Sequence, residues 1–270
     1  NSADTHEPTA GPTSGAVDEA ALPDGSDKNS PNERTTGTLD FSGHGDALGL
    51  SVDGTPITAG NDGSNGGLGT RIVGDYGNLY VKSDGSWTYD LVDNTTAHKD
   101  TGTTDGDGDR GVADQVQDLF AFTVTDGDGD TASSNLTINV NDDGPSASAE
   151  GTVAVNEGSY VDGKFDFVQG ADGATVTAIN GVTLVFGEGG WSQVIAGEQG
   201  GLRVKSDGSY RFTAADDSSH LTPDAYTFTV TDGDGDTASG TVTFNSADMH
   251  EPTAGATSGT VDEAALPDGS

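Results

Sequence analysis

The segments NLYVKSDGSWTYDL (residues 78–91) and GLRVKSDGSYRFT (residues 201–213) decide the fold. In each, apolar and polar residues alternate on both sides of an Asp-Gly turn, which is the pattern of a half-buried β-hairpin. A net charge of −35 with only 31% hydrophobic residues is also typical of a disordered acidic chain. A disordered chain would not repeat the hairpin pattern, so the sequence predicts small folded β modules.

A second repeat shows how the modules are arranged. The twelve residues FTVTDGDGDTAS occur at 122–133 and again at 228–239, once after each hairpin. The first 26 residues also return at 245–270 with three differences. We therefore expect two modules per repeat unit, and we expect this chain to hold one unit of a longer tandem array together with the start of the next.

The module boundaries follow from aligning these repeats. We expect a linker at 1–11, a first module at 12–143 with an insert at about 97–118, a second module at 144–248, and the start of the next repeat at 249–270. No convincing helix is present. The alternation predicts strands at 37–42, 47–52, 70–74, 78–83, 86–91, 119–125, 134–140, 152–156, 164–168, 175–179, 182–186, 201–205, 208–213, 225–231 and 239–245.

About seven short strands per module, separated by Gly, Asp and Asn turns, are typical of an immunoglobulin-like sandwich. The predicted fold class is therefore all-β, with tandem immunoglobulin-like (cadherin-like) β-sandwich modules. Aromatic residues at alternating strand positions are expected to pack in the cores rather than to stack on a ligand. They are Trp87, Tyr89, Phe120, Phe122, Tyr210, Phe212, Tyr226 and Phe228.

The repeated twelve residues carry closely spaced carboxylates, which repel one another unless a cation lies among them. Asp126, Asp128 and Asp130 occupy the loop between the last two strands of the first module. Asp232, Asp234 and Asp236 are their equivalents in the second. Alternating glycines let three carboxylates converge, and oxygen-only ligands favour calcium over zinc or copper. The alternative is a solvated Asp-Gly turn.

In a seven-strand sandwich the loop between the last two strands faces the preceding linker. The linker NDDGP (141–145) and the end of the first strand should lie beside the acidic loop of the second module. The sequence therefore predicts a shared calcium site at the hinge. Its residues are Glu19, Asp142, Asp143, Asp232, Asp234 and Asp236.

Equivalent junctions are expected on both sides of this one. Glu157 and Asp248 would serve the next junction, and Asp4 would join the Asp126 loop at the preceding one. The insert holds another triad, Asp105, Asp107 and Asp109, which resembles the opening of an EF-hand loop. It lacks that motif's glycine and closing Glu, so a weaker calcium loop and a plain flexible acidic loop both remain open.

Together, the twelve-residue repeat, the SDGSWTYDL hairpin, the NDDGP linker and the VDEA starts resemble the repeat modules of large bacterial repeats-in-toxin adhesins and related VCBS-type repeats. That resemblance implies type I secretion, immunoglobulin-like extender modules, calcium at the junctions and a bacterial cell-surface protein of attachment or biofilms. The linker also resembles a cadherin junction. The insert, and the lack of a GGxGxD calcium roll, depart from the family pattern.

Composition excludes several other classes. Forty-five acidic against ten basic residues argue against binding to nucleic acid or anionic membranes, and no apolar segment is long enough for membrane insertion. Without cysteine, thiolate catalysis and disulfides are impossible. Enzyme motifs are absent, and the five histidines are expected in surface turns or linkers. We expect a monomeric, non-enzymatic spacer whose partners are neighbouring repeats and calcium. The alternative is a sugar- or protein-binding module, with the module that holds the insert as the candidate.

Overall fold

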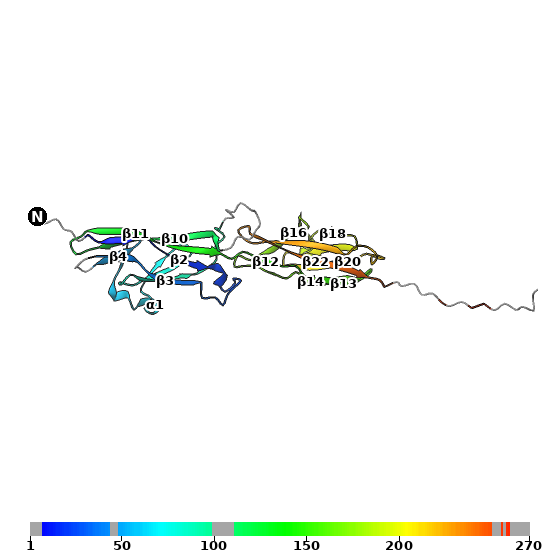
Figure 1. Ribbon diagram of the computed structural model, residues 1–270, viewed down its shortest axis with the longest axis horizontal. Helices are drawn as coiled ribbons and strands as arrows, with labels where there is room; N and C mark the ends of the chain where they lie inside the picture. Colours follow the sequence, from blue (N-terminus) through cyan, green and yellow to red (C-terminus); the bar gives the residue numbers. More distant parts are fainter. Residues whose placement is uncertain (1–6, 44–47, 99–110, 250–254, 256–257, 260–270) are drawn as a thin grey trace, which may run out of the picture.

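The computed structural model describes residues 7–43, 48–98, 111–249, 255 and 258–259, with side chains of the third range from residue 115. Two β-sandwiches follow one another along the long axis, and strands β11 and β12 meet between them (Figure 1). Helical structure in these ranges is limited to short turns, and none is long and apolar enough to cross a membrane. The short helical turns are η1 (Glu19–Ala21), η2 (Ala59–Asn61), α1 (Ser64–Gly67) and η3 (Glu188–Gly190).

The first sandwich packs a five-stranded sheet, in the order β2-β11-β10-β5-β6, against a four-stranded sheet, in the order β3-β9-β8-β7. A short pair, β1 with β4, lies beside them. The strands are β1 (Thr9–Gly11), β2 (Thr13–Asp18), β3 (Arg34–Thr38), β4 (Asp40–Ser42), β5 (Gly49–Val52), β6 (Thr55–Ile57), β7 (Thr70–Val73), β8 (Gly77–Val81), β9 (Ser86–Leu91), β10 (Gly111–Thr125) and β11 (Thr131–Asp142).

The second sandwich repeats this topology strand for strand. Its sheets run β13-β22-β21-β16-β17 and β14-β20-β19-β18, with β12 and β15 as the short pair. In both sandwiches the first strand of the five-stranded sheet pairs in parallel with the last, β2 with β11 and β13 with β22. The strands are β12 (Ser146–Ala147), β13 (Thr152–Asn156), β14 (Tyr160–Lys164), β15 (Phe167–Val168), β16 (Thr175–Ile179), β17 (Val182–Thr183), β18 (Ile195–Ala196), β19 (Gly200–Val204), β20 (Ser209–Ala214), β21 (Asp224–Thr231) and β22 (Thr237–Ala247).

Each sandwich has its own core, built by the alternation along its strands. In β9, for example, Trp87, Tyr89 and Leu91 are buried and the residues between them are not. Phe212 stacks on Phe244 at 4.4 Å between ring centroids in the second core. All eight aromatic residues expected in the cores are buried, which confirms that prediction. The predicted all-β, tandem immunoglobulin-like fold class is likewise what the structure has.

The predicted strands at 37–42 and 164–168 were wrong in the same way. At 37–42 the chain leaves the four-stranded sheet after Thr38 and pairs again as β4. Along 160–168 it does the same between β14 and β15. In both sandwiches the chain thus passes from the four-stranded sheet to the short two-stranded pair, and the ladder breaks between them.

Other strands differ in length or were not expected. Strand β10 begins at Gly111 rather than at 119, so the second half of the insert continues the sheet. The short strands β1, β6, β12 and β18 carry too few residues for an alternating pattern to identify them. Strand β2 has six residues, but its sequence TSGAVD contains only Ala and Val as apolar residues. The proposed module boundaries remain predictions, although each core is built from residues of one predicted module, apart from Ala10 of the predicted linker and one contact between the sandwiches.

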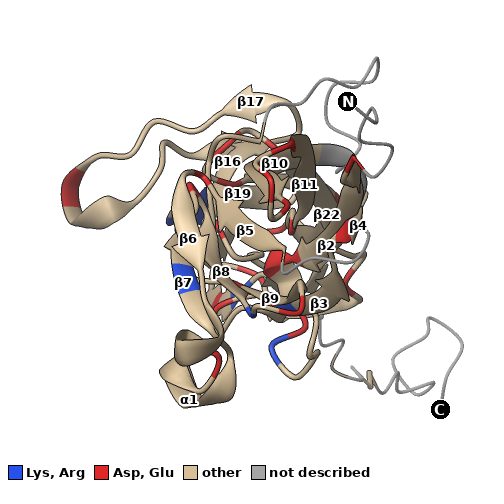
Figure 2. Ribbon diagram, turned by 90° about the vertical axis from the view of Figure 1, so that its left-hand side faces the viewer, with Lys and Arg blue, Asp and Glu red and all other residues tan. Residues whose placement is uncertain are grey.

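That contact lies at the junction. Ala171, from the loop between β15 and β16, packs against the first core. Gly170 in the same loop has φ +74°, and a Cβ added there would lie 2.0 Å from the carbonyl oxygen of Asp143. The linker and this loop therefore pass each other at a distance that only glycine permits. Acidic residues are spread over both sandwiches, with few Lys or Arg among them (Figure 2).

Candidate metal centre at the junction

Carboxylates from three segments meet where the sandwiches join. Asp142 ends β11, Asp172 lies between β15 and β16, and Asp234 lies between β21 and β22. One ligand atom from each lies within 4.8 Å of the others. Asp232 and Asp236 form a second group of the same kind with Asp234. The junction thus brings together five carboxylates from segments far apart in the sequence.

The acidic loop of the second sandwich is shaped by its own backbone. The Asp232 N–H donates to the Asp236 carbonyl at 3.1 Å, and the Gly235 N–H donates to Asp232 Oδ1 at 3.1 Å. Gly235, at φ +120°, occupies a conformation that favours glycine. These bonds close a tight turn on which the side chains of alternate residues converge.

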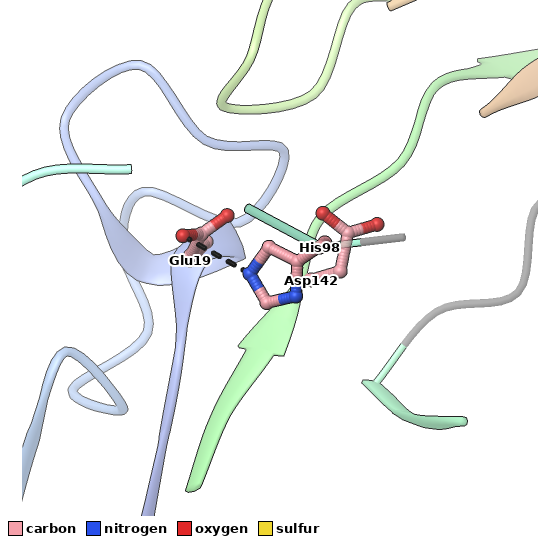
Figure 3. Close-up of side chains that lie close together, drawn as sticks. All are labelled: Glu19, His98 and Asp142. Atoms are coloured by element: carbon pink, nitrogen blue, oxygen red, sulfur yellow. Dashed lines mark ion pairs between the residues drawn. The ribbon is translucent and has the colours of Figure 1, made fainter. Parts of the chain in front are cut away.

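A buried glutamate and histidine extend the cluster toward the first sandwich (Figure 3). Glu19, the first residue of η1, is fully buried, and its Oε1 accepts the Thr95 N–H at 2.8 Å. His98 Nε2 lies 3.4 Å from the same oxygen. Asp142 completes this group within 4.8 Å. The prediction that His98 is a surface histidine was wrong, because the segment after β9 folds back over Glu19 and buries the imidazole.

Several oxygen atoms in this cluster are buried without a hydrogen-bond partner among the described residues. Burying a polar atom without a partner is unfavourable, so such a concentration at one place points to a missing ligand. The atoms are Glu19 Oε2, Asp142 Oδ2, Asp172 Oδ2, Asp232 Oδ2 and both carboxylate oxygens of Asp234.

The same crowding raises the pKa values of the acids. Burial, followed by the charges of Asp234 and Asp236, raises the pKa of Asp142 to about 9. Burial and the neighbouring Asp234 raise the pKa of Asp232 to about 7. Burial also raises the pKa of Glu19 and of Asp172. Without a cation, the cluster can be fully ionised at neutral pH only at a cost in free energy.

The identical loop of the first sandwich provides a comparison. Asp126, Asp128 and Asp130 also lie within 4.8 Å of one another, but Asp128 and Asp130 are exposed. Contact with Asp128, together with backbone N–H groups, lowers the pKa of Asp126. The same twelve residues therefore give an open acidic turn in one sandwich and a buried cluster in the other. What differs is the cover supplied by the linker, η1 and the segment after β9.

Not every predicted ligand joins the cluster. Asp143 is buried, but its carboxylate accepts the backbone N–H of Ser26 at 2.8 Å and also the Ser26 hydroxyl, so it fastens the linker to the first sandwich. Glu157 and Asp248 lie at the far end of the second sandwich, away from this cluster. Asp4, Asp105, Asp107 and Asp109 lie outside the described residues.

Two members of the cluster, Asp172 and His98, were missed in the sequence. Asp172 stands in GADGA, an ordinary turn by composition, and its carboxylate accepts a hydrogen bond from the Asn94 amide across the junction. A carboxylate in the loop that faces the NDDGP linker could have signalled Asp172. No pattern around His98 could have signalled its burial.

The residues present suit a hard divalent cation. Six carboxylates with buried unpartnered oxygens or close acidic neighbours provide an oxygen-rich donor set of the kind that calcium takes. Gly144 also leaves room beside them, since a Cβ there would lie 2.8 Å from Asp236 Oδ2 and 3.5 Å from Asp142 Oδ2. The linker backbone therefore passes close to these two carboxylates.

Residues 141–245 match a family model described as a bacterial Ig domain. Over 192 residues the chain is 27% identical to the "calcium-binding lectin RapA2" of Rhizobium johnstonii, covering 65% of this chain and 74% of that protein. Three cadherin domains (EC1-3) of mouse protocadherin PcdhgC3 are 14% identical over 90% of this chain and 69% of that one, with a TM-score of 0.29. The eight N-terminal Ig domains of Down syndrome cell adhesion molecule are 14% identical over 79% of this chain, which spans only 25% of theirs, with a TM-score of 0.27. The chain is an all-β tandem of immunoglobulin-like sandwiches, and its second sandwich is similar to bacterial Ig domains.

Proposed function

We propose that this chain is a non-enzymatic spacer segment of a large bacterial cell-surface adhesin, and that calcium at the junction stiffens it. Its partners are then calcium and the neighbouring repeats of the same chain, and it works as a monomer outside the cell, in surface attachment or biofilm formation. The observation that carries the proposal is the buried carboxylate cluster, to which both sandwiches and the linker contribute.

The chain's own residues explain how such a junction would respond to calcium. Asp142 lies at the end of β11, where the linker begins. Asp172 and the Asp232–Asp236 loop belong to the second sandwich. Glu19 belongs to the first. When these carboxylates repel one another, the hinge favours open arrangements; a bound divalent cation supplies the positive charge that lets them stay together. Binding only to the closed junction then stabilises it by mass action.

The comparisons support parts of this proposal. A bacterial Ig domain is in keeping with a repeated extracellular module, and the relative's name includes calcium binding. The resemblance of the repeats to adhesins of the repeats-in-toxin type supports the surface location and export by type I secretion.

Small-angle X-ray scattering in millimolar calcium, and then in excess chelator, tests the proposal. We expect a rigid two-sandwich rod with calcium and a more flexible chain, with a broader distribution of interatomic distances, without it. A profile that chelation leaves unchanged would contradict the spacer mechanism.

The repeated loop provides matched variants for this experiment. Asp232→Asn with Asp234→Asn should give the flexible profile even in calcium, because both carboxylates belong to the junction. Asp126→Asn with Asp128→Asn makes the same change in the same twelve residues but in the open loop, and should leave the rod intact. Equal effects of the two pairs would show that overall charge, rather than the junction, sets the stiffness.

A second candidate function is carbohydrate binding, favoured by the lectin in the relative's name and by one face of the second sandwich. There Lys205 Nζ lies 4.9 Å and the Arg211 guanidinium 6.0 Å from the ring of half-buried Trp191. Arg203 and Arg211 line an open groove of about 590 Å³ beside it. An aromatic ring with cationic neighbours near a groove suits a sugar, and this supports the second sandwich as the candidate rather than the module with the insert.

A glycan array probed with the whole chain tests this candidate. Trp191→Ala and Arg211→Ala should abolish any binding seen. Arg34→Ala is the control, because Arg34 pairs with Asp90 on the first sandwich as Arg211 pairs with Asp162 on the second. No glycan bound by the wild-type chain, or binding that survives both changes, would exclude this face.

A further inference from the structure

The histidine in the junction is the feature that calcium does not explain. His98 is 3% exposed, its Nε2 makes an ion-pair contact with Glu19 Oε1 at 3.4 Å, and neither ring nitrogen makes a closer hydrogen bond to a described residue. An imidazole nitrogen is a poor ligand for calcium, which takes oxygen, and a good one for zinc and similar transition metals. We propose that Glu19, His98 and Asp142 form a second cation position, selective for a transition metal such as zinc, beside the oxygen-only calcium position.

The spacing of the donors fits that assignment. His98 Nε2 and Glu19 Oε1 are 3.4 Å apart, too far for a good hydrogen bond. Two ligands on a tetrahedral zinc ion, each bonded at about 2.0–2.1 Å, lie about 3.3–3.4 Å apart. Glu19 Oε2, buried and without a partner among the described residues, offers a further donor atom. Asp142 brings the third ligand within 4.8 Å of the other two (Figure 3).

Supporting contacts hold the ligands in place, as metal sites require. The Thr95 N–H fixes Glu19 Oε1 at 2.8 Å, and the Ala97 N–H donates to the Thr95 hydroxyl at 3.1 Å, which shapes the turn leading into His98. Glu19 itself starts η1, whose preceding residue, Asp18, accepts the Ala20 N–H at 3.0 Å. These ligands come from a capped turn and a braced loop, not from mobile side chains on the surface.

Asp142 belongs both to this group and to the group with Asp172 and Asp234. A carboxylate has two oxygens, so one residue can bridge two neighbouring cations. The second cation would tie the segment after β9 to the linker within the first sandwich, and calcium would tie the linker to the second sandwich. The inference rests on the junction described for the proposed function, but it does not require that calcium stiffen the chain.

Cobalt(II), which replaces zinc and absorbs visible light according to its ligands, is the probe for the test. The whole chain is titrated with cobalt in millimolar calcium, which occupies the oxygen-only carboxylate sites. We expect about one tightly bound cobalt with a spectrum typical of four or five ligands, displaced by zinc. His98→Asn should weaken binding by at least about tenfold, because even the loss of an outer-shell partner of a ligand costs about that much. His220→Asn changes an exposed histidine and should have no effect.

The zinc-edge X-ray absorption spectrum of the wild-type chain, loaded with calcium and then with zinc, reports the zinc ligands without the need for a variant. Scattering from one imidazole supports the site, and an oxygen-only shell overturns it. Equal cobalt binding by wild type and His98→Asn, or loss of all cobalt to calcium, also overturns it. Small-angle scattering curves recorded in calcium alone separate the two proposals. If the chain stays flexible in calcium but binds cobalt through His98, the calcium spacer is refuted and the second cation position is not.

Discussion

Without metal, the free energy of unfolding should fall as the pH rises from 5 to 8. Burial and neighbouring acids raise the pKa of Asp142 to about 9 and that of Asp232 to about 7. In the unfolded chain both carboxyls titrate near pH 3.9, at about the model-peptide value. The folded protein therefore keeps protons that the unfolded chain has lost. This contribution is fully present below about pH 4 and is lost as the pH rises through 7 and then 9.

The structure sets the size of the effect. One proton held only by the folded state makes stability fall by about 1.4 kcal/mol for each pH unit. From pH 5 to 8, Asp142 alone would give about 4 kcal/mol, and Asp232 would add to it up to its own pKa. The two acids together would give about 7 kcal/mol, and water on the open side of the acidic loop screens these charges, so we expect about half, roughly 3–4 kcal/mol. That is a large part of the stability of an ordinary domain.

Urea unfolding, followed by the fluorescence of Trp87 and Trp191, measures this loss at pH 5 and pH 8 in excess chelator. Calcium should remove most of it at pH 8, because metal binding favours the ionised carboxylates. The effect of Asp142→Asn on the free energy of unfolding should change sign between chelator and calcium. In chelator at pH 8 it removes the cost of keeping this carboxyl protonated in the folded state and stabilises the protein, whereas in calcium it removes a ligand and destabilises it.

Two results would refute this reasoning. Equal stability at pH 5 and pH 8 in chelator would mean that the junction acids ionise without cost, as they would in an open junction. An Asp142→Asn variant that is destabilised equally with and without calcium would mean that this side chain serves packing or hydrogen bonding and not charge.

Two further changes test the geometry. Gly144→Ala should weaken calcium binding, measured by calorimetry, by at least about tenfold, because its Cβ would crowd Asp236 Oδ2. Gly151→Ala is the control and should leave the affinity unchanged, because no atom lies within 4 Å of the added carbon. Equal affinities of the two variants would show that the ion lies elsewhere. Tyr89→Phe should cost about 1–3 kcal/mol in urea unfolding, because the Tyr89 hydroxyl donates to buried Asp118 at 2.5 Å; a neutral result would mean that water replaces the hydroxyl.

The twelve-residue repeat shows what local sequence can predict. In FTVTDGDGDTAS the alternation correctly places Phe122 and Phe228 in the two cores, and the Asp-Gly run correctly places a turn between paired strands. These features depend only on the strand itself and on its neighbour across the hairpin. The same letters could not tell the exposed Asp128 from the half-buried Asp234, because the difference is made by segments that cover one loop and not the other.

The members of the cluster divide in the same way. Asp142 and the Asp232 loop could be predicted, because repeat alignment places a linker beside the loop between the last two strands. His98 and Asp172 could not, because each reaches the junction through a loop whose path depends on contacts with distant residues: Thr95 with Glu19 for one, and Asn94 with Asp172 for the other. Asp143 has the expected position, but its oxygens accept hydrogen bonds from Ser26, and its role as a ligand stays a prediction.

The far end of the second sandwich repeats the arrangement around Glu19 that the first sandwich contributes to the junction. Glu157 is buried there, and its Oε1 accepts the Ser219 N–H at 2.6 Å, as Glu19 Oε1 accepts the Thr95 N–H at 2.8 Å. Each sandwich therefore has a backbone-held glutamate at one end and an acidic loop at the other. Under the proposed function, the glutamate end would become a complete metal site when the acidic loop of a following sandwich covers it. In a tandem array every added sandwich would then add one junction, and stiffness would grow with the number of junctions rather than with the number of acidic residues.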